Sequence, residues 1–135
     1  MPLTTSQVQA FASQWFGAWN SHNLDAILSC YDASIEHSSP FIKRYNEAVG
    51  KGDEPSIHGI PELRGYFGRA LERNPTLRFD PAHVATGLES AILVYRRHSH
   101  DTPPTGELSA EIFFLTSPLS PTAVPKIVRS VSHYG

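Results

Sequence analysis

The stretch AWNSHNLDAILSCYDASIEHSSPF, residues 18–41, contains the change from helix to strand that decides the fold. Asn23 is a favourable helix cap, and it precedes a short apolar face formed by Leu24, Ile27, Leu28 and Tyr31. Residues 34–38 then alternate as the residues of a strand do. His37 lies in this strand, so it points either to solvent, with little consequence, or into a pocket, where it can carry chemistry.

The residues before this stretch form the clearest helical pattern of the chain. Ser6 and Gln9 have the spacing of a capping box. The apolar residues that follow recur at helical period: Val8, Phe11, Ala12, Trp15, Phe16 and Trp19. This pattern predicts an amphipathic helix with one broad apolar face.

The segment 42–58, downstream of the strand, is poor in apolar residues and predicts a long loop that binds a ligand or acts as a lid. A third helix is expected to start near Pro61, because proline is favoured at the first helical position. It ends at Asn74-Pro75. Its apolar side consists of Leu63, Tyr66, Phe67, Ala70 and Leu71.

The last part of the chain predicts four strands, at about 77–86, 90–99, 107–116 and 125–134. Gly87 and two proline-containing stretches separate them. Helices followed by a meander of strands predict a single α+β domain over residues 1–135, with the helices packed on one face of a mostly antiparallel sheet.

The composition restricts the function classes. The chain has a formal net charge of −2 and no clustered basic run, which argues against nucleic acid as a partner. No apolar stretch reaches the ~20 residues that span a bilayer, and the N-terminus lacks the order of a signal peptide. We therefore expect a soluble cytoplasmic protein without a membrane partner. The single cysteine, Cys30, lies in an apolar run and is expected in the core.

Three stretches resemble the nuclear transport factor 2-like superfamily, which includes ketosteroid isomerases and SnoaL-type polyketide cyclases. They are AWNSHNLDAILSCYDASIEHSSPF at 18–41, GIPELRGYFGRALERNPTLRF at 59–79 and VPKIVRSVSHYG at 124–135. The order of predicted elements agrees with this resemblance. The resemblance implies a cone of cystatin-like arrangement, in which a curved sheet wraps around three helices and leaves an apolar cavity open at one end.

The resemblance to a ketosteroid isomerase also suggests site residues. His37 falls where that enzyme has its general-base aspartate, and Glu111 where it has the protonated aspartate of the oxyanion hole. Trp15 falls at the tyrosine that donates to the oxyanion, and Phe67 at a further tyrosine. Every catalytic side chain has therefore changed, but two ionisable groups remain at the implied cavity positions, and the two would share one water-poor cavity and be coupled.

Glu111 lies in the stretch ELSAEIFFLTS, residues 107–117, where both faces of the predicted strand are apolar. A carboxylate among such neighbours is costly unless it is paired or protonated. Two interpretations follow: an ion pair with Arg96 from the facing strand, or a carboxylic acid of raised pKa that donates to a substrate oxygen. The two are compatible.

Further residues are candidates for the cavity wall. Trp15 and Trp19 either pack in the core or donate an indole N–H to a ligand. The other candidates are Tyr31, Phe41, Tyr66, Phe67, Val94, Arg96, Phe113, Ser130, Ser132 and Tyr134. The opposite face of the last strand, with Ile127, Arg129, Val131 and His133, would lie on the convex side of the sheet, where the resemblance implies a homodimer.

These observations predict a cofactor-free cone that binds a small apolar ligand. If it is an enzyme, we expect isomerisation, aldol-type cyclisation or dehydration of a carbonyl compound, with His37 as base, Glu111 as acid or oxyanion partner and Arg96 as electrostatic tuner. The alternatives are a non-catalytic ligand-binding protein and a protein-interaction domain. No metal site is expected, because His98 and His100 lack a third ligand, and no glycine-rich phosphate loop is present.

Overall fold

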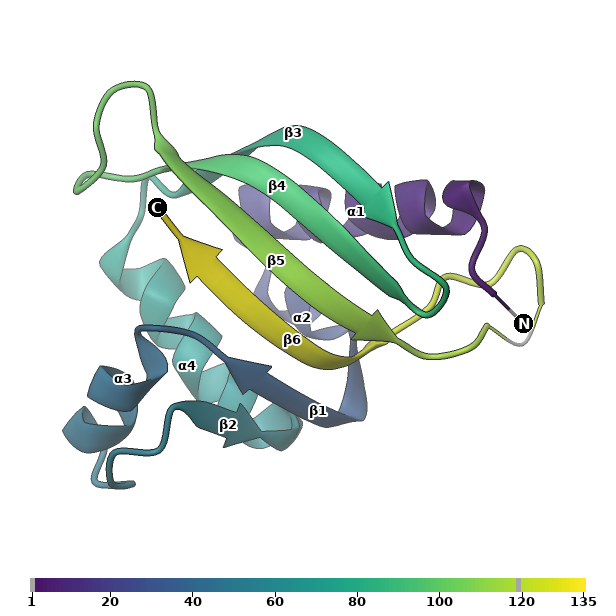
Figure 1. Cartoon of the computed structure of the whole chain (residues 1–135). Coiled ribbons are helices and arrows are strands. Elements are labelled where there is room, and N and C mark those ends of the chain that lie inside the picture. Colours follow the sequence, from purple (N-terminus) through teal and green to yellow (C-terminus); the bar gives the residue numbers. More distant parts are fainter. Residues whose placement is uncertain (1, 119) are drawn as a thin grey trace.

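The computed structural model describes residues 2–118 and 120–135, and within them a six-stranded sheet of order β2-β1-β6-β5-β4-β3 curls around helices (Figure 1). The helices are α1 (Thr5–Asn20), α2 (Leu24–Leu28), α3 (Ile42–Ala48) and α4 (Gly59–Arg73). The strands are β1 (Tyr31–Ser38), β2 (Ser56–His58), β3 (Arg78–Thr86), β4 (Ser90–His98), β5 (Glu107–Leu115) and β6 (Ile127–Tyr134). The expected α+β class is confirmed.

The sheet is mixed but mostly antiparallel. Strand β1 pairs with β6 in parallel, and every other pair in the described sheet is antiparallel. Helices α1, α2 and α4 lie on one side of the sheet, with α1 packed on β3 and α4 on β1 (Figure 1). The chain reaches β1 early and β6 last, so the parallel pair joins the two halves of the chain.

Local chemistry explains where the first helices begin. Helix α1 is capped by Thr4, whose Oγ1 accepts from the Gln7 backbone N–H while the Gln7 side chain accepts from the Thr4 backbone N–H. The expected capping box at Ser6 and Gln9 is therefore wrong by two positions, because the same motif also occurs at Thr4 and Gln7 and acts there. Asn23 caps α2 as expected, by accepting from the Ala26 N–H.

The segment 42–58 is not the loop that its composition predicts. It contains α3 and the short strand β2, which pairs with β1. Helix α3 buries only Ile42 and Asn46, so it has no apolar stripe that a sequence pattern could reveal. The Asn46 side-chain amide donates to the carbonyl oxygens of Glu54 and Ser56, at 2.8 and 3.3 Å, and holds the following turn against the helix.

The core is an aromatic cluster between α1 and the concave face of the sheet. Trp15 lies at its centre, with ring contacts to Phe16, Trp19, Phe79, Tyr95 and Phe113. Ile127 belongs to this core, contrary to its expected place on the convex face, because an irregularity between Phe114 and Leu115 shifts the register of β6. Cys30 is also buried, and burial raises the pKa of its thiol to about 11.

Candidate functional site

A cavity of about 320 Å³ opens between the concave face of the sheet, α3 and α4. This volume lies at the lower end of the range of about 300–1,000 Å³ that is typical of small-molecule sites. Ten of the fourteen side chains expected at the site line it: Trp15, Trp19, Tyr31, His37, Phe41, Tyr66, Phe67, Glu111, Ser132 and Tyr134. The curled sheet therefore gathers residues from both ends of the sequence around one space.

His37 points into this cavity from β1. Its side chain is 3% exposed, and its ring contacts the rings of Tyr66 and Phe67. The Nδ1 atom lies 2.5 Å from the Oγ atom of Ser130 on the adjacent strand β6. Burial lowers the pKa of His37 to about 3, so the imidazole is neutral at physiological pH. Hydrogen bonding at Nδ1 leaves Nε2 as the ring nitrogen for a ligand.

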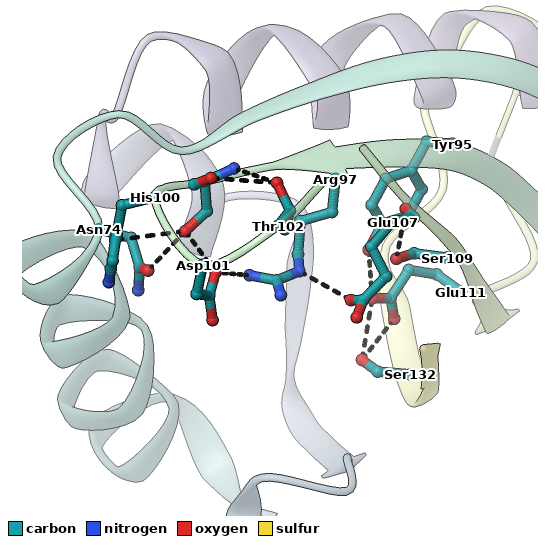
Figure 2. A network of polar contacts seen from close by, with 11 residues as sticks. Asn74, Tyr95, Arg97, His100, Asp101, Thr102, Glu107, Ser109, Glu111 and Ser132 are labelled. Atoms are coloured by element: carbon teal, nitrogen blue, oxygen red, sulfur yellow. Dashed lines mark hydrogen bonds and ion pairs between the residues drawn. The ribbon is translucent and has the colours of Figure 1, made fainter. Parts of the chain in front are cut away.

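Glu111 lies on the inner face of β5 and is 4% exposed. Its Oε1 atom accepts from the Tyr95 hydroxyl at 3.0 Å and from the Ser132 hydroxyl at 2.9 Å, and Oε2 lies 2.7 Å from the same serine (Figure 2). Burial raises the pKa of Glu111 from its ordinary 4.5 to about 7, although both hydroxyls favour the carboxylate. The carboxyl group is therefore protonated below neutral pH, and Oε2, with fewer donors, is the oxygen that can carry the proton.

The two shifts invert the usual order of acidity in this cavity. In water a glutamate with a pKa of about 4.3 gives its proton to a histidine with a pKa of about 6.5. Here the Glu111 pKa is about 7 and the His37 pKa about 3, both because of burial. A neutral acid and a neutral base thus coexist in one pocket just below neutral pH.

The two tryptophans use their indole groups differently. The Trp15 N–H donates to the Tyr31 hydroxyl at 3.1 Å, so it is already occupied. Tyr31 keeps its own hydroxyl hydrogen for another acceptor, and burial together with the nearby Glu111 charge raises its pKa. The buried Trp19 N–H has no partner among the residues that the structure describes. The Trp15 N–H can therefore influence a ligand only through Tyr31, whereas the Trp19 N–H is a hydrogen-bond donor at the cavity without a partner in the described part of the chain.

Four expected site residues do not line the cavity. Ser130 is buried beneath His37, and Phe113 packs in the core against Phe11 and Trp15. Val94 and Arg96 were expected in the cavity wall, and this is wrong, because strand alternation directs Leu93, Tyr95 and Arg97 inward instead.

The expected ion pair between Glu111 and Arg96 is consequently wrong as well. Arg96 is exposed, and its strand partners are Leu108 and Asp80. Arg97 lines the cavity in its place and contacts Asp101 at 3.6 Å and Glu107 at 3.1 Å (Figure 2). The hydrogen-bond partners of Glu111 are hydroxyl groups, and no cation among the described residues pairs with it to lower its pKa. Burial is therefore the largest effect on the pKa of Glu111.

The sequence patterns missed the outer part of the cavity. Its lining includes Arg44, Tyr45 and Ala48 from α3, and Arg69 and Arg73 from α4. Arg69 and Arg73 are four residues apart, the spacing that places two side chains on one face of a helix. The spacing of Arg69 and Arg73 is visible in the sequence and could have predicted their shared face. The α3 residues could not be predicted in this way, because the composition of their segment does not indicate a helix.

A curled sheet around helices, with a cavity at its concave side, is the fold of the nuclear transport factor 2-like superfamily. The family profile of the SnoaL-like domain matches residues 12–113. The chain belongs to this SnoaL-like family. No curated protein matches the chain.

Solved structures agree with this assignment. The chain is 29% identical to a SnoaL-like protein of unknown function from Burkholderia thailandensis E264, with 99% of each chain covered and a TM-score of 0.79. A SnoaL-like protein from Agrobacterium tumefaciens C58, provisionally described as an isomerase, is 13% identical over 97% of this chain and 99% of its own, with a TM-score of 0.70. A provisionally described polyketide cyclase from Sinorhizobium meliloti is 9% identical over 97% and 100%, with a TM-score of 0.68.

The described residues were also compared with the requirements of a membrane-spanning helix and of a metal site. None of the helices in the described part of the chain is long and apolar enough to cross a membrane. Within residues 2–118 and 120–135, no three His, Cys, Asp or Glu side chains come together as a metal site would require. His98 contacts Asp80 through Nε2 at 2.9 Å.

Proposed function

We propose that this protein catalyses cofactor-independent proton transfer on a small, largely apolar carbonyl compound. The observation that carries the proposal is the inverted acidity of Glu111 and His37, which supplies a neutral acid and a neutral base in one cavity. Such a pair suits isomerisation, aldol-type cyclisation or dehydration, since each proceeds by removal of a proton next to a carbonyl group. Two similar structures are provisionally described as an isomerase and as a polyketide cyclase, and isomerisation and cyclisation are among the reactions proposed here.

His37 is the base in this proposal. When Nδ1–H donates to the Ser130 hydroxyl, Nε2 carries the lone pair that accepts the substrate proton. The low pKa keeps the imidazole unprotonated, so every molecule is ready to accept a proton at neutral pH. The same low pKa makes His37 a weak base, so the reaction depends on stabilisation of the enolate that forms.

Glu111 and Tyr31 supply that stabilisation. Protonated Glu111 donates from Oε2 to the developing oxyanion, and the Tyr31 hydroxyl is a second donor, since it accepts from Trp15 and has its hydrogen free. The aromatic wall formed by Trp19, Phe67 and Phe79 excludes water and strengthens both hydrogen bonds. In an isomerisation the proton on His37 returns to another carbon, and in a dehydration it leaves with the hydroxyl group as water. In an aldol-type cyclisation the enolate carbon attacks a second carbonyl carbon, and the proton moves to the alkoxide that forms.

The test is exchange of α-protons for deuterium in a panel of aryl ketones and β-hydroxy ketones, followed by proton NMR at pD 6.5. We expect His37→Gln to slow exchange by about 10²–10⁴-fold, and Glu111→Gln to slow it by at least about tenfold. Matched controls are His133→Gln and Glu36→Gln, which make the same chemical changes at residues outside the cavity. Binding without exchange for the whole panel would instead identify a non-catalytic ligand-binding protein.

A further inference from the structure

The outer part of the cavity is strongly basic. Arg44, Arg69, Arg73 and Arg97 all line it, although the whole chain carries a formal net charge of −2. Arg97 is neutralised by Asp101 and Glu107, as described above. Arg44, Arg69 and Arg73 have no ion-pair partner among the described residues, whereas Arg64 and Arg78, which lie outside this cavity, are paired with Asp25 and Asp80.

The acids nearest in sequence do not compensate these three arginines. Glu47 on α3 and Glu72 on α4 are exposed and do not line the cavity. Arg69 is oriented by Tyr45, since its Cζ atom lies 6.0 Å from the centre of that ring. Arginines without an ion-pair partner at the edge of a cavity attract an anion, and a guanidinium matches the geometry of a carboxylate.

The cavity is therefore divided by its chemistry. Its inner part is formed by aromatic rings with His37 and Glu111. Its more exposed outer part is formed by the arginines of α3 and α4, together with the ion pair of Arg97 and Asp101. An uncharged apolar ligand would leave the outer part without a partner, and a fully polar anion would leave the aromatic part without one. A compound with an apolar body and one acidic group satisfies both.

We infer that the ligand of this cavity carries a carboxylate, which Arg44, Arg69 and Arg73 bind at the cavity's outer end. This inference rests on the proposed function, which places the reacting compound in the same cavity. The carboxylate fixes the orientation of the ligand, so that its apolar, reacting end lies beside His37 and Glu111. The arginines thus select keto acids or aromatic acids over neutral ketones of the same shape.

The test compares two probes of almost identical shape, 1-naphthaleneacetate and 1-naphthaleneacetamide, by isothermal titration calorimetry at pH 7. We expect the carboxylate to bind the wild-type protein at least about tenfold more tightly than the amide. The double variant Arg69→Gln/Arg73→Gln should lose this preference, while Arg64→Gln/Arg78→Gln, which removes the same charge outside the cavity, should keep it. Thermal melting checks that both variants fold.

A second measurement needs no variant. The preference of the wild-type protein for the carboxylate should shrink several-fold between 50 mM and 500 mM NaCl, because salt screens charges at an open cavity mouth. Equal affinity for the two probes, binding of neither at millimolar concentration, or an unchanged preference in Arg69→Gln/Arg73→Gln would overturn the inference. A clear carboxylate preference without any deuterium exchange would support the arginine site while contradicting the proposed catalysis, so the two failures can be told apart.

Discussion

His37 and Glu111 lie on the two strands that flank β6, and each is hydrogen-bonded to a serine of that strand. The serines, Ser130 and Ser132, are two residues apart and therefore point to the same face of the sheet. Two strand spacings, about 10 Å, separate the backbones of β1 and β5. Both side chains line the same cavity, and the proposed proton transfer depends on this arrangement.

The first prediction concerns the pH dependence of proton exchange. The proposed mechanism needs neutral His37 and protonated Glu111, whose pKa values are about 3 and about 7. The exchange rate should be level between pH 5 and 6.5 and should fall about tenfold per pH unit well above pH 7. Glu111→Gln should be slower but should lose this fall. A rate that instead rises through pH 7 would make ionised Glu111 the base and exclude the roles assigned here.

The second prediction concerns stability. Burial raises the Glu111 pKa, so the folded state holds a proton that the unfolded state releases, and stability falls as pH rises from 4.5 to 7. Burial lowers the His37 pKa, so the unfolded state takes up a proton first, and stability falls as pH drops below 6.5. The two effects oppose each other between pH 4.5 and pH 6.5.

Single variants separate these two effects. The free energy of unfolding of His37→Gln should fall by roughly 2–3 kcal/mol from pH 5 to pH 8, because only the Glu111 effect remains. That of Glu111→Gln should rise by roughly 2 kcal/mol over the same range, because only the His37 effect remains. Urea denaturation at both pH values measures each change. A flat pH profile in either variant would show that the group remaining in that variant titrates normally in the folded protein.

Periodic patterns in the sequence were sufficient to predict the fold class. The resemblance to a ketosteroid isomerase placed His37 and Glu111 in the cavity, strand alternation placed Ser132 on the inner face of the last strand, and all three line the cavity. The prediction that Val94 and Arg96 face inward is wrong by one residue, because Leu93, Tyr95 and Arg97 face inward instead. A shift of one residue exchanges the two faces of a strand.

The outer part of the cavity could not be predicted for a different reason. Helix α3 buries so little apolar surface that nothing in its composition distinguishes it from a loop. Its position follows from tertiary contacts, such as the hydrogen bonds of Asn46 to the turn that follows. Arg44 joins Arg69 and Arg73 only through that packing, so the basic end of the cavity is a property of the folded chain.

The third prediction compares the two tryptophans. Trp15→Phe removes the hydrogen bond to Tyr31 and disturbs five ring contacts, so it should cost about 2–3 kcal/mol of unfolding free energy. Trp19→Phe removes a buried N–H without a partner and should cost less than about 1 kcal/mol. Urea denaturation of the two variants provides the comparison. Equal losses would mean that ring packing alone decides both, and that the Trp15–Tyr31 hydrogen bond contributes nothing.

The last prediction concerns the convex face of the sheet, where we propose that two copies of the chain associate. Ile92, Leu108 and Phe114 are 40%, 49% and 40% exposed on that face, and strand pairing places Ile92 beside Ile112, which in turn lies beside Val131. Several exposed apolar side chains on one sheet face suit an isologous dimer. Arg129, whose Cζ atom lies 5.4 Å from the Phe114 ring centre, adds a polar group of the kind that interfaces favour.

Phe114→Lys tests this dimer, because it places a charge on the exposed apolar face. Light scattering coupled to size-exclusion chromatography should show a dimer for the wild-type chain and a monomer for the variant. Leu88→Lys is the matched control, since Leu88 is 74% exposed in the turn between β3 and β4, and it should leave the dimer intact. A wild-type monomer at high micromolar concentration, or a dimer that survives Phe114→Lys, would assign this face to something other than self-association.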